Sequence, residues 1–240
     1  AATGIITAFA GGGWGALGDG GPATSAYIAQ ATAIVIDDAG DLYLADHVNN
    51  RIRKVSAATG IITTVAGGDS YGFGGDGGPM AEATINFPQG LDIDEAGNLY
   101  IGDTYNHRIR KVAAATGLIS TIAGTGTPEY SGDGGLASLA GLSVPTDVAA
   151  SGGAIYVCEI SGARIRKIAD ASAPAFTAQP SNKSTDIGGT VSFAAEVAGF
   201  PLPALAWQVS SNGTTWADLT NTAPYSGVTS ARTPAGSIDW

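Results

Sequence analysis

Three aspartates in glycine-rich segments are the residues of this sequence most suited by type and spacing to contact a ligand. Asp19, Asp76 and Asp133 lie in LGDGGPATSA, GGDGGPMAEA and SGDGGLASLA, and each is 57 residues from the next. Loops that bring three carboxylates to one face of a protein could contact a cation or a polar ligand. Each GDGG loop supplies one acid, however, whereas calcium takes six to eight oxygen ligands, so no loop is a complete calcium site.

The same loops could instead serve the fold. Glycine permits left-handed turns that other residues avoid, and aspartate accepts hydrogen bonds from nearby backbone N–H groups. The regular spacing indicates a repeated architecture. We therefore expect a structural role for the three aspartates, with ligand binding through the same loops as the alternative.

A second set of charged residues recurs with the same period. In each repeat an acid precedes an arginine by five residues, and the pairs are Asp46 and Arg51, Asp103 and Arg108, and Glu159 and Arg164. We expect Asp46 and Asp103 to accept hydrogen bonds that stabilise the loop between two strands, with Arg51 and Arg108 as candidate donors. The third repeat departs from the other two, because it has Glu159 in place of aspartate and Gly162 in place of asparagine.

The sequence offers no candidate for a catalytic residue, a metal ligand or a cofactor site. The two histidines, His47 and His107, occupy different offsets within their repeats. Cys158 lies in the apolar stretch IYVCE, where a small buried side chain is expected. Nucleophile-elbow, phosphate-loop and zinc-protease motifs are absent.

The elements that position these residues are short strands. From Gly90 to Gly124 the segments LDID, LYIGD, RIRKV and LISTIA are separated by turn residues. Four short antiparallel strands are the content of one propeller blade. In RIRKV the apolar residues are three apart, so strict alternation fails and a bulge is one explanation. Similar units begin at Ala33 and Asp147.

The segment GNLYIGDTYNHRIRKV resembles the signature of the NHL-repeat family of β-propellers. With GDGGPAT between units, it is similar to NHL repeats of large secreted bacterial proteins. The resemblance covers residues 1–169 and implies three four-stranded propeller blades. It also implies a protein that binds protein or other extracellular ligands through its loops.

The composition changes at residue 170. Residues 170–175 are rich in alanine and contain Pro174, as a linker would. Residues 176–240 resemble part of a bacterial immunoglobulin-like domain, with Trp207 in the place of the buried tryptophan of that fold. A complete sandwich needs about 100 residues. We therefore expect a partial immunoglobulin-like β-sandwich without convincing strands after PYSGVTS.

Charge and hydropathy narrow the function. The formal net charge of -10 argues against nucleic acid and against anionic membrane surfaces. Apolar runs are too short for a membrane span. We expect a non-catalytic interaction module of a secreted or cell-surface bacterial protein. The alternative is an extracellular propeller lyase or hydrolase with a metal in its central channel.

The expected strands do not complete the expected blades. GIITAFAG, from Gly4, has the character of a fourth strand, and the third unit contains three strands ending at Ile168. Closed propellers use about four to eight blades. The sequence therefore predicts either a head-to-tail dimer with six blades or a fragment of a longer chain.

Overall fold

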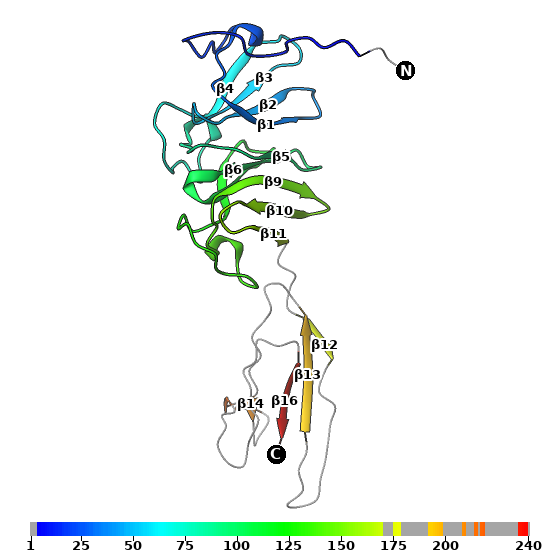
Figure 1. The fold of residues 1–240 in the computed structure, drawn as a ribbon. Helices are drawn as coiled ribbons and strands as arrows, with labels where there is room; N and C mark the ends of the chain where they lie inside the picture. Colours follow the sequence, from blue (N-terminus) through cyan, green and yellow to red (C-terminus); the bar gives the residue numbers. More distant parts are fainter. Residues whose placement is uncertain are drawn as a thin grey trace, which may run out of the picture. The chain divides into compact units, whose positions relative to one another are not determined.

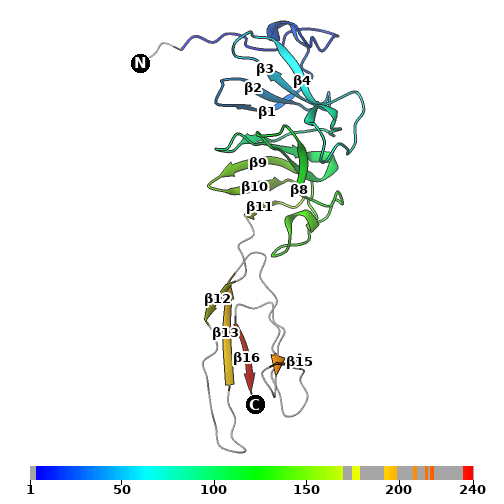
Figure 2. The same ribbon diagram turned by 180° about the vertical axis from the view of Figure 1, so that it is seen from behind.

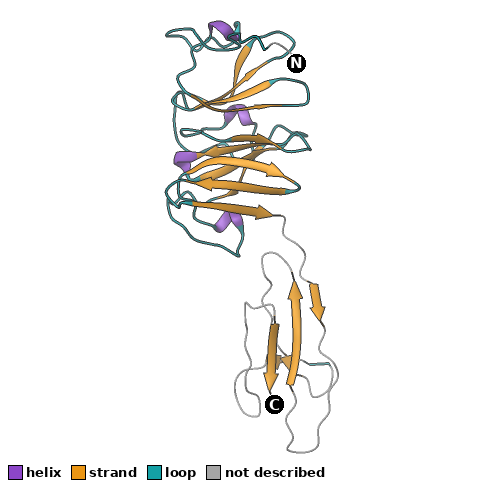
Figure 3. Ribbon diagram, turned by 45° about the vertical axis from the view of Figure 1, so that its right-hand side comes forward, coloured by secondary structure: helices purple, strands orange, loops and turns teal. Residues whose placement is uncertain are grey.

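The computed structural model describes residues 4–169 continuously, followed by residues 175–178, 192–198, 208–209, 214–215, 217–218 and 235–239. The chain divides into two compact units, Ala1–Ala169 and Asp170–Trp240. The described part is all-β, as predicted, with short 3-10 turns between some strands (Figures 1 and 3).

Three antiparallel sheets make up the first unit. The first contains β1 (Ala31–Ile36), β2 (Leu42–Asp46), β3 (Arg51–Val55) and β4 (Ile62–Gly67). The second contains β5 (Leu91–Ile93), β6 (Leu99–Asp103), β7 (Arg108–Val112) and β8 (Ile119–Ala123). The third contains β9 (Pro145–Ser151), β10 (Ala154–Glu159) and β11 (Arg164–Ala169). Strands that follow one another in the chain are neighbours in each sheet, which is the order predicted for propeller-like blades.

The turns between the first two strands of the first and second sheets have the same side-chain support. The Oδ1 atom of Asp37 accepts hydrogen bonds from the backbone N–H groups of Ala39 and Asp41, at 3.0 and 2.9 Å. Asp94 does the same for Ala96 and Asn98. These contacts are aspartate turns, and they explain why DDAGD and DEAGN reverse the chain where they do.

A bulge occurs where β3 pairs with β4 and again where β7 pairs with β8. Ile52 lies opposite Ala66 while Arg53 lies opposite Thr64, so Val65 is the extra residue. The second sheet repeats this shift between Ile109 and Arg110. The bulge suggested by the RIRKV pattern is therefore present, with the extra residue on the partner strand.

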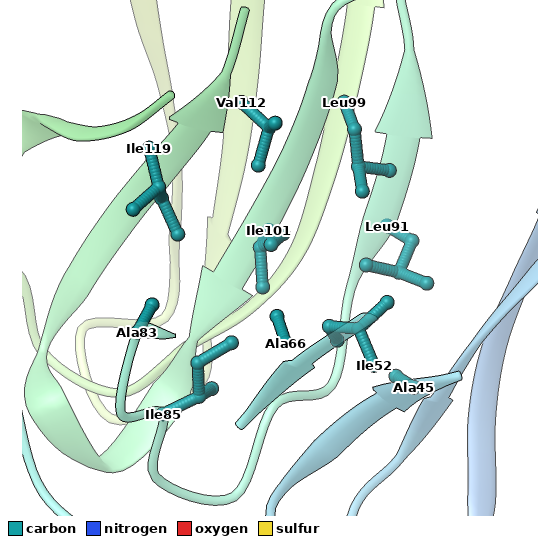
Figure 4. Packing of buried hydrophobic residues seen from close by; sticks show 10 residues of the cluster. All are labelled: Ala45, Ile52, Ala66, Ala83, Ile85, Leu91, Leu99, Ile101, Val112 and Ile119. Carbon is teal, nitrogen blue, oxygen red and sulfur yellow. The ribbon is translucent and has the colours of Figure 1, made fainter. Parts of the chain in front are cut away.

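Two of the three core clusters lie between neighbouring sheets, and the third packs the first sheet against the segment that precedes it. Figure 4 shows the cluster between the first and second sheets, where Ile52 contacts the side that carries Leu91 and Ile101. A second cluster joins the second and third sheets and includes Tyr100, Ile109, Leu142, Val148 and Val157. Full burial of one such aliphatic side chain contributes roughly 1.5–3 kcal/mol. Packing between sheets is thus a main source of stability, and the stack of sheets is visible in Figures 1 and 2.

Residues 4–11 differ from expectation. The segment GIITAFAG was expected to form a strand but has no strand assignment, and its apolar side chains Ile5 and Ile6 are exposed. No strand of the described residues pairs with this segment, although Ala10 packs against the cluster of the first sheet and the N–H of Gly11 donates to Ala23.

Two small sheets are described in the second unit. β12 (Ala175–Ala178), β13 (Ser192–Ala198) and β16 (Ala235–Asp239) form an antiparallel sheet in the order β12-β13-β16. β14 (Gln208–Val209) pairs with β15 (Ala217–Asp218). After PYSGVTS, where no convincing final pair of strands was expected, the described residues contain one strand, β16, which pairs with β13 along its whole length. Trp207 lies outside the described residues.

The second and third sheets approach each other closely at Gly90. A Cβ atom at this position would lie 2.5 Å from the Cα atom of Asp147. Gly90→Ala should therefore force the two sheets apart and cost about 1–3 kcal/mol, as overpacking does. Gly68→Ala is the matched control, because a Cβ atom there meets nothing within 4 Å. Equal melting temperatures of the two variants by circular dichroism would contradict this prediction.

Candidate functional site

Each sheet of the first unit contains an arginine held between two carboxylates. In the first sheet, Nη2 of Arg53 lies 2.9 Å from Oδ1 of Asp19, and Nη1 lies 3.3 Å from Oδ2 of Asp46. The side chains of Arg53 and Asp46 are fully buried, while Asp19 is partly exposed. We call this group of three residues the arginine clamp.

The clamp recurs in the other two sheets. Arg110 lies 2.8 Å from Asp76 and 3.2 Å from Asp103. Arg166 lies 2.6 Å from Asp133 and 3.4 Å from Glu159. The glutamate that replaces aspartate in the third repeat therefore keeps its contact with arginine.

The arginine also holds the backbone of the GDGG loop. Nη2 of Arg53 donates to the carbonyl oxygen of Leu17 at 2.9 Å, and Nη2 of Arg110 donates to Gly74 at 3.0 Å. In the third sheet Arg166 donates to Ser131 at 2.9 Å. Because guanidinium donors are rigid and always charged, one side chain can hold both the acid and the turn beside it.

The GDGG loop in turn pairs with the outermost strand of its own sheet. The N–H of Gly77 donates to the carbonyl of Ile119, and the N–H of Ile119 donates to Gly78. Gly20 and Gly21 make the same two bonds with Ile62 in the first sheet. The repeated glycines thus give the loop backbone a short stretch of ladder with β4 and β8.

The arginine expected to contact the acids was the wrong one. Arg51 lies directly opposite Asp46 in the ladder, yet its guanidinium contacts the carbonyl of Asn49 and the carboxylate of Asp69. Arg108 donates to the backbone carbonyls of Asn106 and Thr125. Arg164 donates to the carbonyl of Gly162. Two positions further along each strand, on the same face, the second arginine of RIRK reaches the acid instead.

The acids at the ends of β2 and β6 bind both the loop that follows and the segment that precedes the first strand of the same sheet. Oδ1 of Asp103 accepts a hydrogen bond from the N–H of Asn86 at 2.8 Å, and Asn106 donates to both oxygens. Asp46 makes the corresponding bonds with Ala29 and Asn49. Burial raises the pKa of the Asp103 carboxyl, while these hydrogen bonds and the charge of Arg110 act against that rise.

Aromatic rings cover two of the three clamps. The guanidinium of Arg108 lies 3.8 Å from the ring centroid of Phe73, and that of Arg110 lies 4.9 Å from it. Tyr130 stands in the same relation to Arg164 and Arg166, at 3.8 and 5.1 Å. The signal in the sequence is an aromatic residue three positions before Asp76 and Asp133, where the first repeat has Ala16.

The histidines lie at the joints between sheets. Nδ1 of His47 donates to the carbonyl of Pro88 at 3.1 Å, and the hydroxyl of Thr104 donates to Pro145 at 2.8 Å. His107 accepts the N–H of Val144 at Nδ1, 3.3 Å away. Asn50 accepts the N–H of Phe87 in the same way, at 2.9 Å. Both donating residues, Phe87 and Val144, have positive φ.

An exposed aromatic side chain precedes two of the three GDGG loops. Trp14 and Tyr71 stand five residues before Asp19 and Asp76, and they are 92% and 73% exposed. The three aspartates lie in three separate clamps, each bound to the arginine of its own sheet. In the first two loops an exposed aromatic side chain therefore precedes a partly exposed carboxylate that is bound to arginine.

Cys158, metal-binding groups and membrane-spanning helices were the other features considered in the sequence. Cys158 was expected to be buried but is exposed, because it lies on the face of β10 that no further sheet covers among the described residues. Within the described ranges no group of three or more histidine, cysteine or acidic side chains could hold a metal ion. No helix in the described part of the chain is long and apolar enough to cross a membrane.

The clamp predicts an order of stabilities. Arg110→Ala leaves Asp103 buried without its charged partner and should cost about 3–5 kcal/mol. Asp76→Ala removes a half-exposed partner and should cost about 0.5–1.5 kcal/mol. Asp69→Ala, which removes a fully exposed carboxylate while Arg51 keeps its bond to the Asn49 carbonyl, is the control and should have little effect. Urea denaturation measures all three, and an Asp76→Ala protein as stable as the control would exclude a structural role for the loop aspartate.

His107 predicts a dependence of stability on pH. Burial and the nearby Arg108 lower the pKa of His107, so the folded protein holds the neutral ring that accepts the Val144 N–H. The unfolded chain then binds more protons, and stability is lost as pH falls below about 6.5. His107→Asn copies Asn50, cannot titrate and should show a smaller loss. Melting temperatures of both proteins between about pH 7 and pH 5 test this. Parallel curves would contradict it.

Comparison with known proteins places part of this chain among NHL repeats. Residues 86–112 match the NHL repeat. Protein SUPPRESSOR OF QUENCHING 1, chloroplastic, of Arabidopsis thaliana is 32% identical over 173 residues, which cover 69% of this chain and 16% of that protein. NHL repeat-containing protein 2 of Homo sapiens is 39% identical over 83 residues, covering 34% of this chain and 11% of that protein.

A solved structure is also similar. The crystal structure of a protein of unknown function from Bacteroides thetaiotaomicron has 28% sequence identity and a TM-score of 0.48, covering 53% of this chain and 32% of that one. This chain thus spans less than a fifth of the length of the two curated relatives named above. It contains an NHL repeat and is similar in sequence to NHL-repeat proteins.

Proposed function

We propose that this chain is a non-catalytic binding module of a secreted or cell-surface bacterial protein, and that the three sheets are NHL-type propeller blades. The ligand is a protein or another extracellular molecule, and it contacts the loops that precede each blade. The NHL repeat at residues 86–112 and the consecutive order of strands in each sheet support the assignment of blades.

The proposal rests on one contrast between charged and aromatic side chains at the GDGG loops. Their carboxylates bind internal arginines, whereas Trp14 and Tyr71 project into solvent from equivalent positions of successive loops. Exposed tryptophan and tyrosine supply large contact areas with few rotatable bonds, and they are enriched among residues that dominate binding energy.

The clamp prepares these loops for binding. Arg53 and Arg110 each hold a loop carbonyl and a loop carboxylate, and the loop glycines pair with β4 and β8. A loop that is already ordered loses little conformational entropy when a ligand binds. The buried clamp therefore supports an exposed aromatic contact surface without taking part in it.

The remaining parts of the proposal concern the whole protein. Residues 176–240 form an immunoglobulin-like spacer or second binding domain. The antiparallel sheet β12-β13-β16 supports this part of the proposal. Export follows from the resemblance of the GDGG segments to repeats of secreted bacterial proteins, and the parent reading frame should encode an export signal. We do not propose the lyase or hydrolase alternative, since both histidines are engaged in contacts between sheets.

The binding surface can be tested by removing the two aromatic side chains. The purified chain is applied to a glycan array and to an array of extracellular proteins. Trp14→Ala and Tyr71→Ala should each weaken retention of a bound component at least about tenfold, as loss of a dominant contact does. Val48→Ala, which shortens a half-exposed side chain in the β2–β3 turn, is the control and should bind normally.

Two results would overturn the proposed function. One is an unmodified protein that retains nothing on either array. The other is a retained component whose binding is unaffected by both aromatic substitutions. Melting temperatures of the variants should equal that of the parent, because neither side chain is packed in the fold.

A further inference from the structure

The third sheet lacks the outer strand that the other two possess. β3 is covered by β4, and β7 by β8, whereas the third sheet of the described residues ends at β11. Ile165 of β11 is 73% exposed, although the equivalent Ile52 and Ile109 are completely buried. Among the described residues, β11 therefore has no strand on its outer edge and carries an uncovered apolar side chain.

Residues 4–11 have the sequence of that missing strand. GIITAFAG corresponds residue by residue to GIITTVAG at 60–67 and GLISTIAG at 117–124, which contain β4 and β8. Ile6 is 99% exposed, whereas the equivalent Ile62 and Ile119 are completely buried. The segment is a β4-type strand without its sheet.

The third GDGG loop also lacks its strand. Gly20 and Gly21 form two backbone hydrogen bonds with Ile62, and Gly77 and Gly78 form two with Ile119. Gly134 and Gly135 hold the same positions, but among the described residues no strand lies beside them to make these bonds. Both the edge of β11 and the loop beside it are thus prepared for one more strand.

The two end sheets also expose complementary faces. Ile34 and Ile36 of the first sheet are exposed, whereas Leu91 and Val148, equivalent to Ile34, are buried against the preceding sheet. Ile165 lies on the opposite face of the third sheet, the one that would meet a following sheet. Leu44, Val55 and Ile62 of that same face of the first sheet are buried in a cluster with residues of the preceding segment, so the exposed apolar part of the face is its β1 strand.

Within the described part of one chain, residues 4–11 do not lie beside β11. Within the first unit the three sheets are stacked in chain order, and the segment at residues 4–11 lies beyond the first sheet, away from β11 (Figures 1 and 2). Three propeller-like sheets are also fewer than the four to eight that close a ring.

We propose that two copies of this chain associate head to tail, and that residues 4–11 of each form the fourth strand of the third sheet of the other. The proposal does not depend on the proposed ligand-binding function. Two-fold symmetry uses both donated strands and both open edges, so the assembly closes at two copies with six complete sheets.

The register follows from the two complete sheets. The pairing of β3 with β4 places Ile6 opposite Ile168, Thr7 opposite Lys167 and Ala8 opposite Arg166. Phe9 takes the bulge position of Val65, and Ala10 then lies opposite Ile165. The third GDGG loop would pair with Ile6 from its other side, as the first does with Ile62.

The joint between copies has no polar latch of the kind found inside the chain. Ile160 and Ala163 stand where His47 and Asn50, and Thr104 and His107, bridge to the next sheet. Association therefore rests on the donated strand and the apolar faces alone. We expect the dimer to dissociate on dilution rather than to be permanent.

Mass and a register-specific cross-link test the proposal. Light scattering should give a mass twice the 23.8 kDa of one chain at tens of micromolar, falling toward one chain on dilution. Ile6→Asp should give the mass of one chain at every concentration. Its fold should be unchanged, because Ile6 is exposed in the single chain.

The cross-link uses a Cys158→Ser background. A chain with Thr7→Cys is mixed with a chain with Lys167→Cys and oxidised, and a disulfide-linked pair should form. Lys111→Cys replaces Lys167→Cys in the control, because β8 already occupies the edge of β7 and no cross-link should form there.

Each outcome decides the question. A mass of one chain at all concentrations overturns the proposal. A dimer that forms the control cross-link as readily as the test cross-link, or that survives Ile6→Asp, shows association through another surface and also overturns it. A dimer with only the Thr7–Lys167 cross-link supports it.

Discussion

A buried arginine between two carboxylates is the interaction on which each sheet of the first unit depends. The guanidinium joins three segments that are distant in sequence, namely the GDGG loop, the end of the second strand and the third strand. Removal of either acid leaves the arginine one partner, whereas removal of the arginine leaves an acid buried alone. Because a desolvated and unpaired charge is costly, the arginine is the least replaceable of the three.

The clamp also explains why the loops can be rich in glycine and still be ordered. Glycine allows the tight path and lets the loop backbone pair with β4 and β8, but it raises the entropy lost on folding. Hydrogen bonds from Arg53 and Arg110 to loop carbonyls offset that loss. Order in the loops thus comes from the sheet beneath them rather than from packing within the loop.

The repeated sheets could be predicted from the sequence because their determinants are local. Alternating apolar residues, aspartate turns and a constant spacing are all visible within one repeat. Arg53 and Asp19, which bind each other, are 34 residues apart in sequence. The local sequence does not indicate which arginine of RIRK points inward. The exposure of Cys158 likewise depends on whether a further sheet covers β10. The local sequence IYVCE gives no information about that. The strand β16 lies in a segment with weak strand character, so its pairing with β13 decides its conformation.

The position of the basic residues in the clamp strands affects how fast charged molecules associate with the first unit. All nine lysines and arginines of residues 1–169 lie in β3, β7 and β11, against sixteen acidic residues. Arg53 and Arg110 are fully buried, and their charges are paired with internal carboxylates. The field outside the first unit is therefore negative, and it attracts cationic molecules and slows the approach of anionic ones. These effects on association rate weaken as ionic strength rises, because salt screens charges beyond about 10 Å at 0.1 M.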